Sequence, residues 1–419
     1  MSYLIDVLDL VSIALKEGSV TIMQKQVFIL FLMLFGLLGS TGLTYFSSGC
    51  SFPWWTTATL NEVKAWMSLG SVATEKCGTG HRFFWPIHGA ASGSTAEAVE
   101  LLIEAGAILN EQDSLGMTPI HYAAQNLKLG VLPTLLEAGA DINLRDQGGY
   151  SVLHFAASGG NPDNVKILIE AGADLAARTE NGLTVVHAAA TSSNTLNLQI
   201  LLEAGADFLV KDVIGITPLH DTKLAPPESV QLLIDAGADL EARDNFDLTP
   251  LLEFSRYGAP GNIEVLIRAG ADLEAVSEEP LSETPLMMAI HRYALDGGCP
   301  IKNIAALIAG GANISLQDEY GDTLLHRAIK QYCEAEVISL LIEEGVSINA
   351  TDIYGNTPLH IAVRSSYIPK TVIERLLTSG VKTDIKNKRG NTPWDEAKES
   401  SLKTRNPKAF WALNDVRFK

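Results

Sequence analysis

The sequence lacks the short motifs that mark common catalytic sites. It contains no G-x-S-x-G nucleophile elbow, no G-x-x-x-x-G-K-[ST] phosphate loop, no H-E-x-x-H zinc helix and no C-x-x-C pair. Carboxylates are plentiful, but no pair stands in the contrasting surroundings that general acid and base catalysis needs. These absences predict a protein that is not an enzyme and that holds no metal or cofactor.

Basic residues are scarce as well. The 419-residue chain has 31 Lys and Arg against 49 Asp and Glu, a net charge of −18. This balance disfavours nucleic acid as a partner, because binding to phosphates needs a basic face. Only the C-terminal end differs, since residues 364–419 carry 13 Lys and Arg against 6 Asp and Glu. An acidic body with a basic end could steer a protein partner; alternatively, the surface charge keeps the chain soluble and monomeric.

Long apolar runs are absent except near the N-terminus. Residues 27–38 have no polar side chain, Lys25 precedes them, and small residues follow. A basic start, a short apolar stretch and a small-residue exit are typical of a secretory signal. Met23 lies just upstream, so we interpret residues 1–22 as a mis-called extension and residues 23–50 as the signal peptide or an anchor.

The same segment has two other interpretations. Extended to Phe46, the apolar run covers residues 27–46, which is long enough to cross a bilayer as a permanent anchor. Cys50 follows a Ser-Gly pair as in a lipidated N-terminus, but Ser47 stands where such sites usually carry an aliphatic residue. The sequence therefore predicts export, to the periplasm or the exterior, or membrane attachment through residues 27–46.

The sequence does contain one abundant feature, which is a repeat of 33 residues. Histidine recurs at this spacing within copies of a Thr-Pro-Leu-His-x-Ala motif: His88, His121, His154, His187 and His220. A second motif, Glu-Ala-Gly-Ala-Asp, closes copies at residues 137–141 and 170–174. Later copies are looser and begin at Thr249, Thr284, Thr323 and Thr357. A fixed period of this length predicts one supersecondary unit copied along the chain.

The two interlocked motifs resemble the ankyrin-repeat family, over residues 81–419. The resemblance implies an all-α solenoid of about nine to ten copies, each a helix-turn-helix followed by a β-hairpin loop. In one copy, Thr118 is a candidate helix N-cap and Pro119 takes the first helical position, where a missing N–H costs nothing. Gly172 is expected to end a second helix in the left-handed conformation. One copy cannot cover its own apolar face, so stacking must bury it.

The ends of the array should differ from its interior, because one side of a terminal repeat faces water. We expect the array at residues 81–390, between a degenerate N-terminal capping repeat at 51–80 and a C-terminal capping repeat at 391–419. The last helix should point Phe410, Trp411 and Leu413 inward. This closing segment resembles the ends of exported bacterial ankyrin proteins.

The four cysteines fit export without proving it. Cys50 and Cys77 flank the first helical segment, and Cys299 and Cys333 lie at equivalent places in adjacent repeats. Neighbouring helices are roughly 8–10 Å apart, whereas a disulfide needs its Cα atoms within about 7 Å. An insertion before Cys299 could bring the second pair closer. Both pairs are candidate disulfides in an exported protein and buried thiols in a cytosolic one.

The repeat histidines suggest metal binding, but their spacing opposes it. Each is alone in its copy, and neighbours lie one helix-packing distance apart, too far to share a zinc ion. The resemblance gives this histidine a structural role, hydrogen-bonded near the Thr-Pro turn. His291 falls outside the repeat position, on the exposed part of its expected helix, and remains a candidate contact residue.

In ankyrin proteins, partners are usually held by hairpin tips and by the exposed side of the first helices, along the concave face. Carried over by position, the candidate partner-binding residues are Leu115, Tyr150, Ile214, Phe246, Tyr320, Tyr354 and His291. Large apolar tips favour a protein-binding edge, since aromatic residues often dominate interface energy. We expect a non-catalytic scaffold that mediates protein–protein interaction after export; the alternative is a membrane-anchored adaptor with its array on the cytoplasmic side. An enzyme would need a pocket in the longer loops at 276–283 and 292–300.

Overall fold

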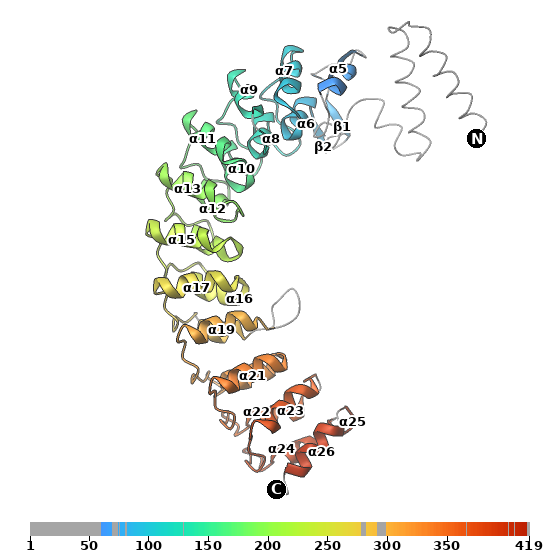
Figure 1. Cartoon of the computed structure of the whole chain (residues 1–419), viewed down its shortest axis with the longest axis vertical. Coiled ribbons are helices and arrows are strands. Elements are labelled where there is room, and N and C mark those ends of the chain that lie inside the picture. The colour runs from blue at the N-terminus through green and yellow to red at the C-terminus, as the bar shows by residue number, and fades with distance from the viewer. Residues whose placement is uncertain are drawn as a thin grey trace, which may run out of the picture. The chain divides into compact units, whose positions relative to one another are not determined.

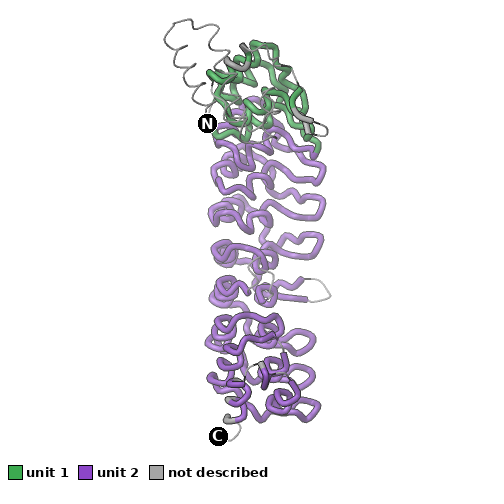
Figure 2. The backbone as a smooth tube through the Cα atoms, turned by 90° about the vertical axis from the view of Figure 1, so that its right-hand side faces the viewer, with its two compact units in different colours: residues 1–147 green, residues 148–419 purple. Residues whose placement is uncertain are grey.

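The computed structural model of the protein describes residues 60–68, 74, 76–79, 82–128, 130–277, 282–290, 299–365, 367–400, 402–405 and 407–416. The segment considered above for export, anchoring or lipidation lies outside these residues, and so do Cys50 and His291. Within the described ranges, no helix is long and apolar enough to cross a membrane. The chain divides into two compact units, residues 1–147 and 148–419 (Figure 2).

Unit 1 contains two stacked helix pairs in its described part. They follow α5 (Leu60–Ser68) and a short antiparallel ribbon of β1 (Cys77–Thr79) and β2 (Arg82–Phe84). The pairs are α6 (Pro86–Gly93) with α7 (Ala96–Glu104), and α8 (Pro119–Gln125) with α9 (Val131–Glu137). Helix α6 packs on α8 and α7 packs on α9, so first helices stack on first helices and second on second.

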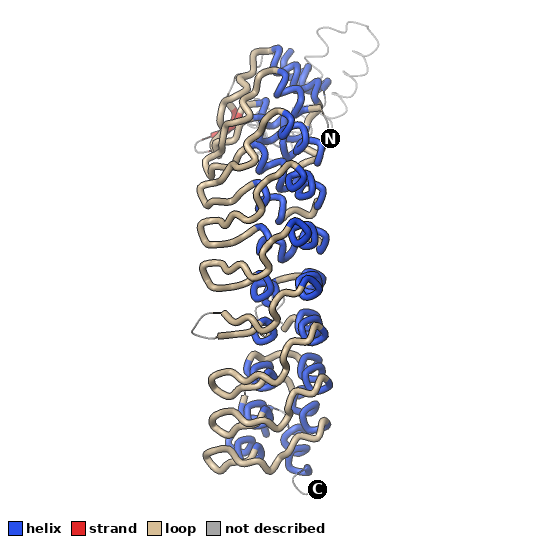
Figure 3. The backbone as a smooth tube through the Cα atoms, turned by 90° about the vertical axis from the view of Figure 1, so that its left-hand side faces the viewer, coloured by secondary structure: helices blue, strands red, loops and turns tan. Residues whose placement is uncertain are grey.

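Unit 2 continues the same pattern over a longer stretch (Figure 1). Its elements are α10 (Val152–Gly159), α11 (Pro162–Glu170), α12 (Val185–Ala190), α13 (Thr195–Glu203), α14 (Pro218–Asp221), η2 (Thr222–Leu224), α15 (Pro227–Ala236), α16 (Pro250–Tyr257), α17 (Pro260–Ala269), α18 (Pro285–Ala289), α19 (Ile301–Ala309), α20 (Leu324–Lys330), α21 (Ala335–Glu343), α22 (Pro358–Arg364), α23 (Lys370–Thr378), α24 (Pro393–Glu399), α25 (Leu402–Arg405) and α26 (Pro407–Val416). The loops between pairs project from one side of the stack as hairpins (Figure 3). The predicted all-α solenoid is confirmed.

Both helix boundaries examined in the sequence follow the expected chemistry. Thr118 precedes α8 and Pro119 is its first residue, and Thr118 forms a reciprocal capping box with His121. At the other end of a pair, Gly172 has a φ of +87°, two residues after the last residue of α11. Only glycine takes this conformation at little cost, so the helix ends there. Both expectations are confirmed.

The C-terminal end of the stack contains one correction. The rings of Trp394 in α24 and Phe410 in α26 lie 4.6 Å apart, and Leu413 is fully buried. Trp411, however, is 50% exposed, so the expectation that it points inward is wrong. Adjacent residues on a helix point about 100° apart, because one turn takes about 3.6 residues. Once Phe410 faces the core, Trp411 turns toward solvent.

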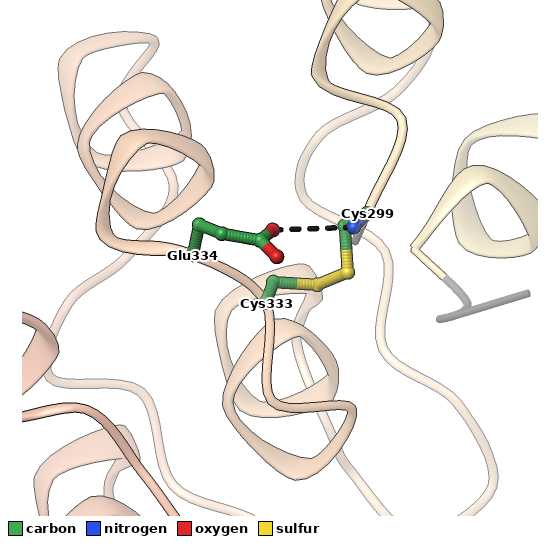
Figure 4. Close-up of a disulfide and its surroundings, with 3 residues drawn as sticks. All are labelled: Cys299, Cys333 and Glu334. Atoms are coloured by element: carbon green, nitrogen blue, oxygen red, sulfur yellow. Dashed lines mark hydrogen bonds between the residues drawn. A yellow bond between two sulfur atoms is a disulfide. The ribbon is translucent and has the colours of Figure 1, made fainter. Parts of the chain in front are cut away.

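A disulfide joins Cys299 to Cys333 across two neighbouring helix pairs (Figure 4). Their Cα atoms are 5.3 Å apart, which is shorter than the roughly 8–10 Å that usually separates packed helices. The reason is position: each cysteine lies in the turn before its second helix, α19 or α21, rather than inside it. The backbone N–H of Cys299 also donates to Oε2 of Glu334 (3.2 Å). Cys77 is disulfide-bonded as well.

Leu201 in α13 offers a test of the stacked core. Its side chain is fully buried, so truncation leaves a cavity between packed helices. We expect Leu201→Ala to lower the free energy of unfolding by about 2–5 kcal/mol. Leu196 lies on the same helix and is 53% exposed, so Leu196→Ala serves as the control and should cost about 0.5 kcal/mol or less. Urea titrations followed by circular dichroism make the comparison, and equal losses would contradict the packing described here.

Candidate functional site

Buried imidazoles connect successive copies through their two ring nitrogens. In α12, Nδ1 of His187 accepts the backbone N–H of Thr184 (3.1 Å), which leaves the proton of the neutral ring on Nε2. Nε2 then donates to the carbonyl oxygen of Ile216 in the next hairpin (3.1 Å). The same bond to a hairpin carbonyl joins His88 to Met117, His154 to Leu183, His220 to Leu248, His326 to Asn356 and His360 to Asn391. The structural role expected for this histidine is confirmed.

The hairpin tips depend on an aspartate whose role the sequence analysis missed. Oδ1 of Asp212 accepts the backbone N–H groups of Ile214 (2.9 Å) and Ile216 (2.8 Å), and thereby closes the turn. The equivalent residues Asp113, Asp244, Asp318 and Asp352 make the same two bonds. The available signal was an aspartate three positions before the tip glycine, a residue that favours turns for this reason.

Neighbouring tips in unit 2 are tied together by their backbones. The N–H of Val213 donates to the carbonyl of Asn181 (3.0 Å), and the N–H of Asn245 donates to the carbonyl of Ile214 (2.9 Å). Further along, Ile353 donates to Tyr320 and Lys388 donates to Tyr354, each at 2.9 Å. Because the main chain makes these bonds, the side chains at the tips take no part in them.

The candidate contact residues fall into two positions. Leu115, Ile214, Phe246, Tyr320 and Tyr354 each immediately precede the last residue of their tip, and all are exposed. Tyr150 instead follows a tip glycine and is half-buried, with its ring centroid 5.7 Å from that of His154 and 6.0 Å from that of Phe155. Unit 2 thus carries Ile214, Phe246, Tyr320 and Tyr354 on its hairpin edge, and unit 1 carries Leu115.

The tip at Phe246 is unusual in its backbone. Asp247 occupies the place that glycine takes in other tips and has a φ of +59°, a conformation that costs an ordinary residue energy. Arg243 holds it there, because Nη1 donates both to Oδ2 (2.5 Å) and to the carbonyl (2.9 Å) of Asp247. Phe246, at 66% exposure, projects from this constrained turn.

Below the tips, the residue that follows the repeat histidine faces the tip aspartate. The hydroxyl of Tyr122 donates to Oδ2 of Asp113 (2.6 Å) in unit 1. In unit 2, Nη1 of Arg327 donates to Oδ2 of Asp318 (3.1 Å), and Nη2 of the same side chain pairs with Glu283. In both copies the donor satisfies the carboxylate oxygen that remains after the other oxygen has closed the tip, and the arginine also neutralises the charge.

Two neighbouring copies carry an acid at this position, Asp221 and Glu253. Glu253 is almost wholly buried; its Oε1 accepts from Nζ of Lys223 (2.5 Å), and its Oε2 has no hydrogen-bond partner among the described residues. Burial raises the pKa of Asp221 to about 7; Lys223 opposes this rise, and the charges of Glu253 and Asp212 add to it. The region holds more negative charge than its own cation neutralises.

A family model described as ankyrin repeats (three copies) matches residues 77–146, 130–212 and 291–389, which together make up more than half of the chain. The chain therefore belongs to the ankyrin-repeat family. Proteins of this family generally serve as scaffolds for protein–protein interaction, and the fold is typically non-catalytic. The matches leave out residues 213–290, which include Asp221 and Glu253.

Many solved structures also match, 581 chains in all. One is the crystal structure of the ankyrin repeat domain of Bcl-3, described as a unique member of the IkappaB protein family. It is 24% identical, with a TM-score of 0.46, and the match covers 56% of this chain and 100% of that one. No curated protein matches the chain. In the described ranges, no group of three or more His, Cys, Asp or Glu side chains is placed to hold a metal ion.

The imidazole bridges make stability depend on pH. Burial lowers the pKa of His88, His187, His220, His326 and His360. Below about pH 6.5 the unfolded chain binds protons that the folded rings refuse, so the free energy of unfolding falls, by up to about 1.4 kcal/mol per pH unit for each ring. Asp221 acts in the opposite direction, because its raised pKa favours the folded state as the pH falls from about 7, but it is one group against five.

We therefore expect the urea midpoint to fall between pH 6.5 and pH 5.5, above the range in which ordinary carboxylates titrate. In the variant His326→Gln the midpoint should be lower at pH 7.5 and should change less with pH, because one titrating ring is gone. A midpoint that stays level or rises between pH 6.5 and pH 5.5 would exclude this account of the repeat histidines.

Proposed function

We propose that the chain is a non-catalytic scaffold that binds another protein along the hairpin edge and concave face of its array. The tip row, defined as Ile214, Phe246, Tyr320 and Tyr354, carries the proposal. Its four large side chains are exposed at one equivalent position of four hairpins, where a merely solvated loop needs none. Exposed apolar residues gathered in this way are typical of protein-interaction sites, and aromatic side chains supply much of their energy.

The backbone supports this use of the tip row. Aspartate bonds close the tips, and main-chain bonds between neighbouring hairpins tie Ile214 to the tip after it, and Tyr320 and Tyr354 likewise. A surface that is already ordered loses little conformational entropy when a partner docks. Ile214 and Phe246, and likewise Tyr320 and Tyr354, are therefore presented at nearly fixed spacing within each pair of neighbouring tips.

We further propose that the scaffold acts after export, as a periplasmic or secreted protein or one tethered through residues 27–46. The Cys299–Cys333 disulfide and the disulfide-bonded Cys77 support this, because disulfides persist mainly in oxidising compartments. The apolar run at 27–38, preceded by Lys25, supplies the sequence feature that export needs.

The tip row can be tested by replacing Phe246, Tyr320 and Tyr354 together with serine. We expect capture of protein partners by the immobilised chain to fall roughly ten-fold or more, because the side chains that bury most area on binding are lost. The matched control replaces Leu224, Tyr257 and Tyr367, which are also large and exposed but lie at the turns from first to second helices, away from the hairpin tips. Both variants should keep the wild-type circular dichroism and urea midpoint. Equal capture by the wild type and the tip variant would remove the site assignment.

Cell fractionation with intact mass and thiol counting tests the compartment. We expect a mature chain that begins after about residue 42, with no free thiol, since the disulfides form only outside the reducing cytosol. A full-length chain in the membrane with free thiols would instead favour the anchored adaptor, with its array on the cytoplasmic side. A full-length chain in the soluble cytosol would contradict both forms of the proposal.

A further inference from the structure

The tip aspartates use one carboxylate oxygen to close the turn and leave the other for a second donor. Two copies supply that donor from the residue nine positions later: Tyr122 for Asp113, and Arg327 for Asp318. The arginine case shows the stronger arrangement, since its guanidinium bridges Asp318 and Glu283 and is itself 9% exposed. The chain thus shows which group satisfies this position when acids surround it.

Two of the copies between these break the rule. Asp221 stands nine positions after Asp212, and Glu253 stands nine positions after Asp244, so an acid occupies the position from which Tyr122 and Arg327 donate. We call these residues the acidic pairs. Oδ1 of Asp212 and Oδ1 of Asp244 each close a tip, and neither second oxygen meets a donor in the part of the chain that the structure describes.

Two of these carboxylates are nine-tenths buried. Asp244 is 8% exposed and Glu253 is 9% exposed, and within the part of the chain that the structure describes Oε2 of Glu253 has no hydrogen-bond partner. A buried carboxylate oxygen without a donor costs free energy that a positive partner would recover. The unmet bonds, rather than the acidity alone, indicate a missing cation.

The cations near the acidic pairs are already engaged or too few. Lys223 pairs with Glu253, Nζ of Lys211 donates to the carbonyl of Arg243, and Arg243 holds Asp247. Among the described residues, Lys223 is thus the one cation that forms an ion pair with any of the four carboxyl groups, and its partner is Glu253. The raised pKa of Asp221 agrees with this, because burial and the charges of Glu253 and Asp212 outweigh the effect of Lys223.

We propose that the acidic pairs receive a basic side chain, preferentially arginine, from the polypeptide that docks on the tip row. The inference rests on the proposed function, since it names the chemistry of that partner: an arginine beside apolar residues. A guanidinium can donate to two carboxylates at once, as Arg327 does, whereas an ammonium group acts as a point charge. Ile214 and Phe246 project from the tips of the same two copies and would contact the flanking apolar residues.

The test uses the full chain and two fluorescent peptides that differ only in arginine or citrulline, each within a repeated Ser-Leu-Arg-Phe sequence. Citrulline keeps the shape of arginine and removes its charge. Fluorescence anisotropy should show the arginine peptide binding at least about ten-fold more tightly to the wild type, the expected contribution of a charge-assisted bond. In the double variant Asp221→Asn with Glu253→Gln, the preference should vanish.

The matched control is Glu228→Gln with Glu264→Gln, which changes net charge equally on exposed positions of α15 and α17 in the same copies. It should keep the preference. Equal binding of both peptides by the wild type would overturn the inference. Equal loss of the preference in the control would replace it with general charge attraction. If Glu253→Gln unfolds the chain, Asp221→Asn alone decides, because its side chain is only partly buried and makes no hydrogen bond with the described residues.

Failure of this inference and failure of the proposed function give different results. If natural partners still depend on Phe246, Tyr320 and Tyr354 while arginine and citrulline peptides bind alike, only the acidic pairs are refuted. If the peptide preference depends on the acidic pairs but natural partners ignore the tip variant, the tip row is refuted as the docking edge.

Discussion

The array depends on a neutral imidazole that satisfies two backbone groups at once. One ring nitrogen accepts the N–H at the start of its own first helix, and the other donates to a carbonyl of the next hairpin. Each bond alone is worth roughly 1 kcal/mol, but both groups are buried and would cost more if left unmet. The histidine therefore fixes the hairpin of one copy to the helix of the copy before it. Buried leucines such as Leu201 join neighbouring copies through apolar packing. Because coupling runs only between neighbours, stability grows copy by copy.

Where the imidazole is missing, other contacts take over. Leu252 and Met287 occupy its position in two consecutive copies, and only the threonine cap remains there. Across this stretch Arg243 reaches the carbonyl of Val276 (2.8 Å), and the Cys299–Cys333 disulfide joins the following pair. The family model also leaves this stretch unmatched. Departures from a repeat pattern are expected where side chains serve a purpose other than folding.

The sequence was sufficient for the parts of the fold that local chemistry decides. Threonine before a helix, proline at its start and glycine after its end act within a few residues, and their periodic recurrence revealed the repeat. It was insufficient where two distant residues meet. The pairing of Arg327 with Glu283 joins residues 44 positions apart in the sequence. The position that an acid occupies in each acidic pair is recognised only when the hairpin is seen folded over the helix. The orientations of Trp411 and Tyr150 change with a shift of one residue along a helix or hairpin, and composition does not define that shift.

The division of labour between backbone and side chains explains why the same copies hold both apolar tips and unmet carboxylates. Aspartate and main-chain bonds close and align the tips, so the residues beside them carry no duty in the fold and are free to differ between copies. Function in such an array lies in those side chains and not in the fold.

The acidic groups and the apolar tips also act over different ranges. Acidic groups attract a basic partner across a distance that salt shortens, to about 8 Å at physiological ionic strength. Apolar tips act only in contact, and salt screening hardly affects them. A partner held by both should associate more slowly as salt rises while it dissociates at a nearly constant rate, since long-range charge mainly governs association and desolvated contact governs dissociation.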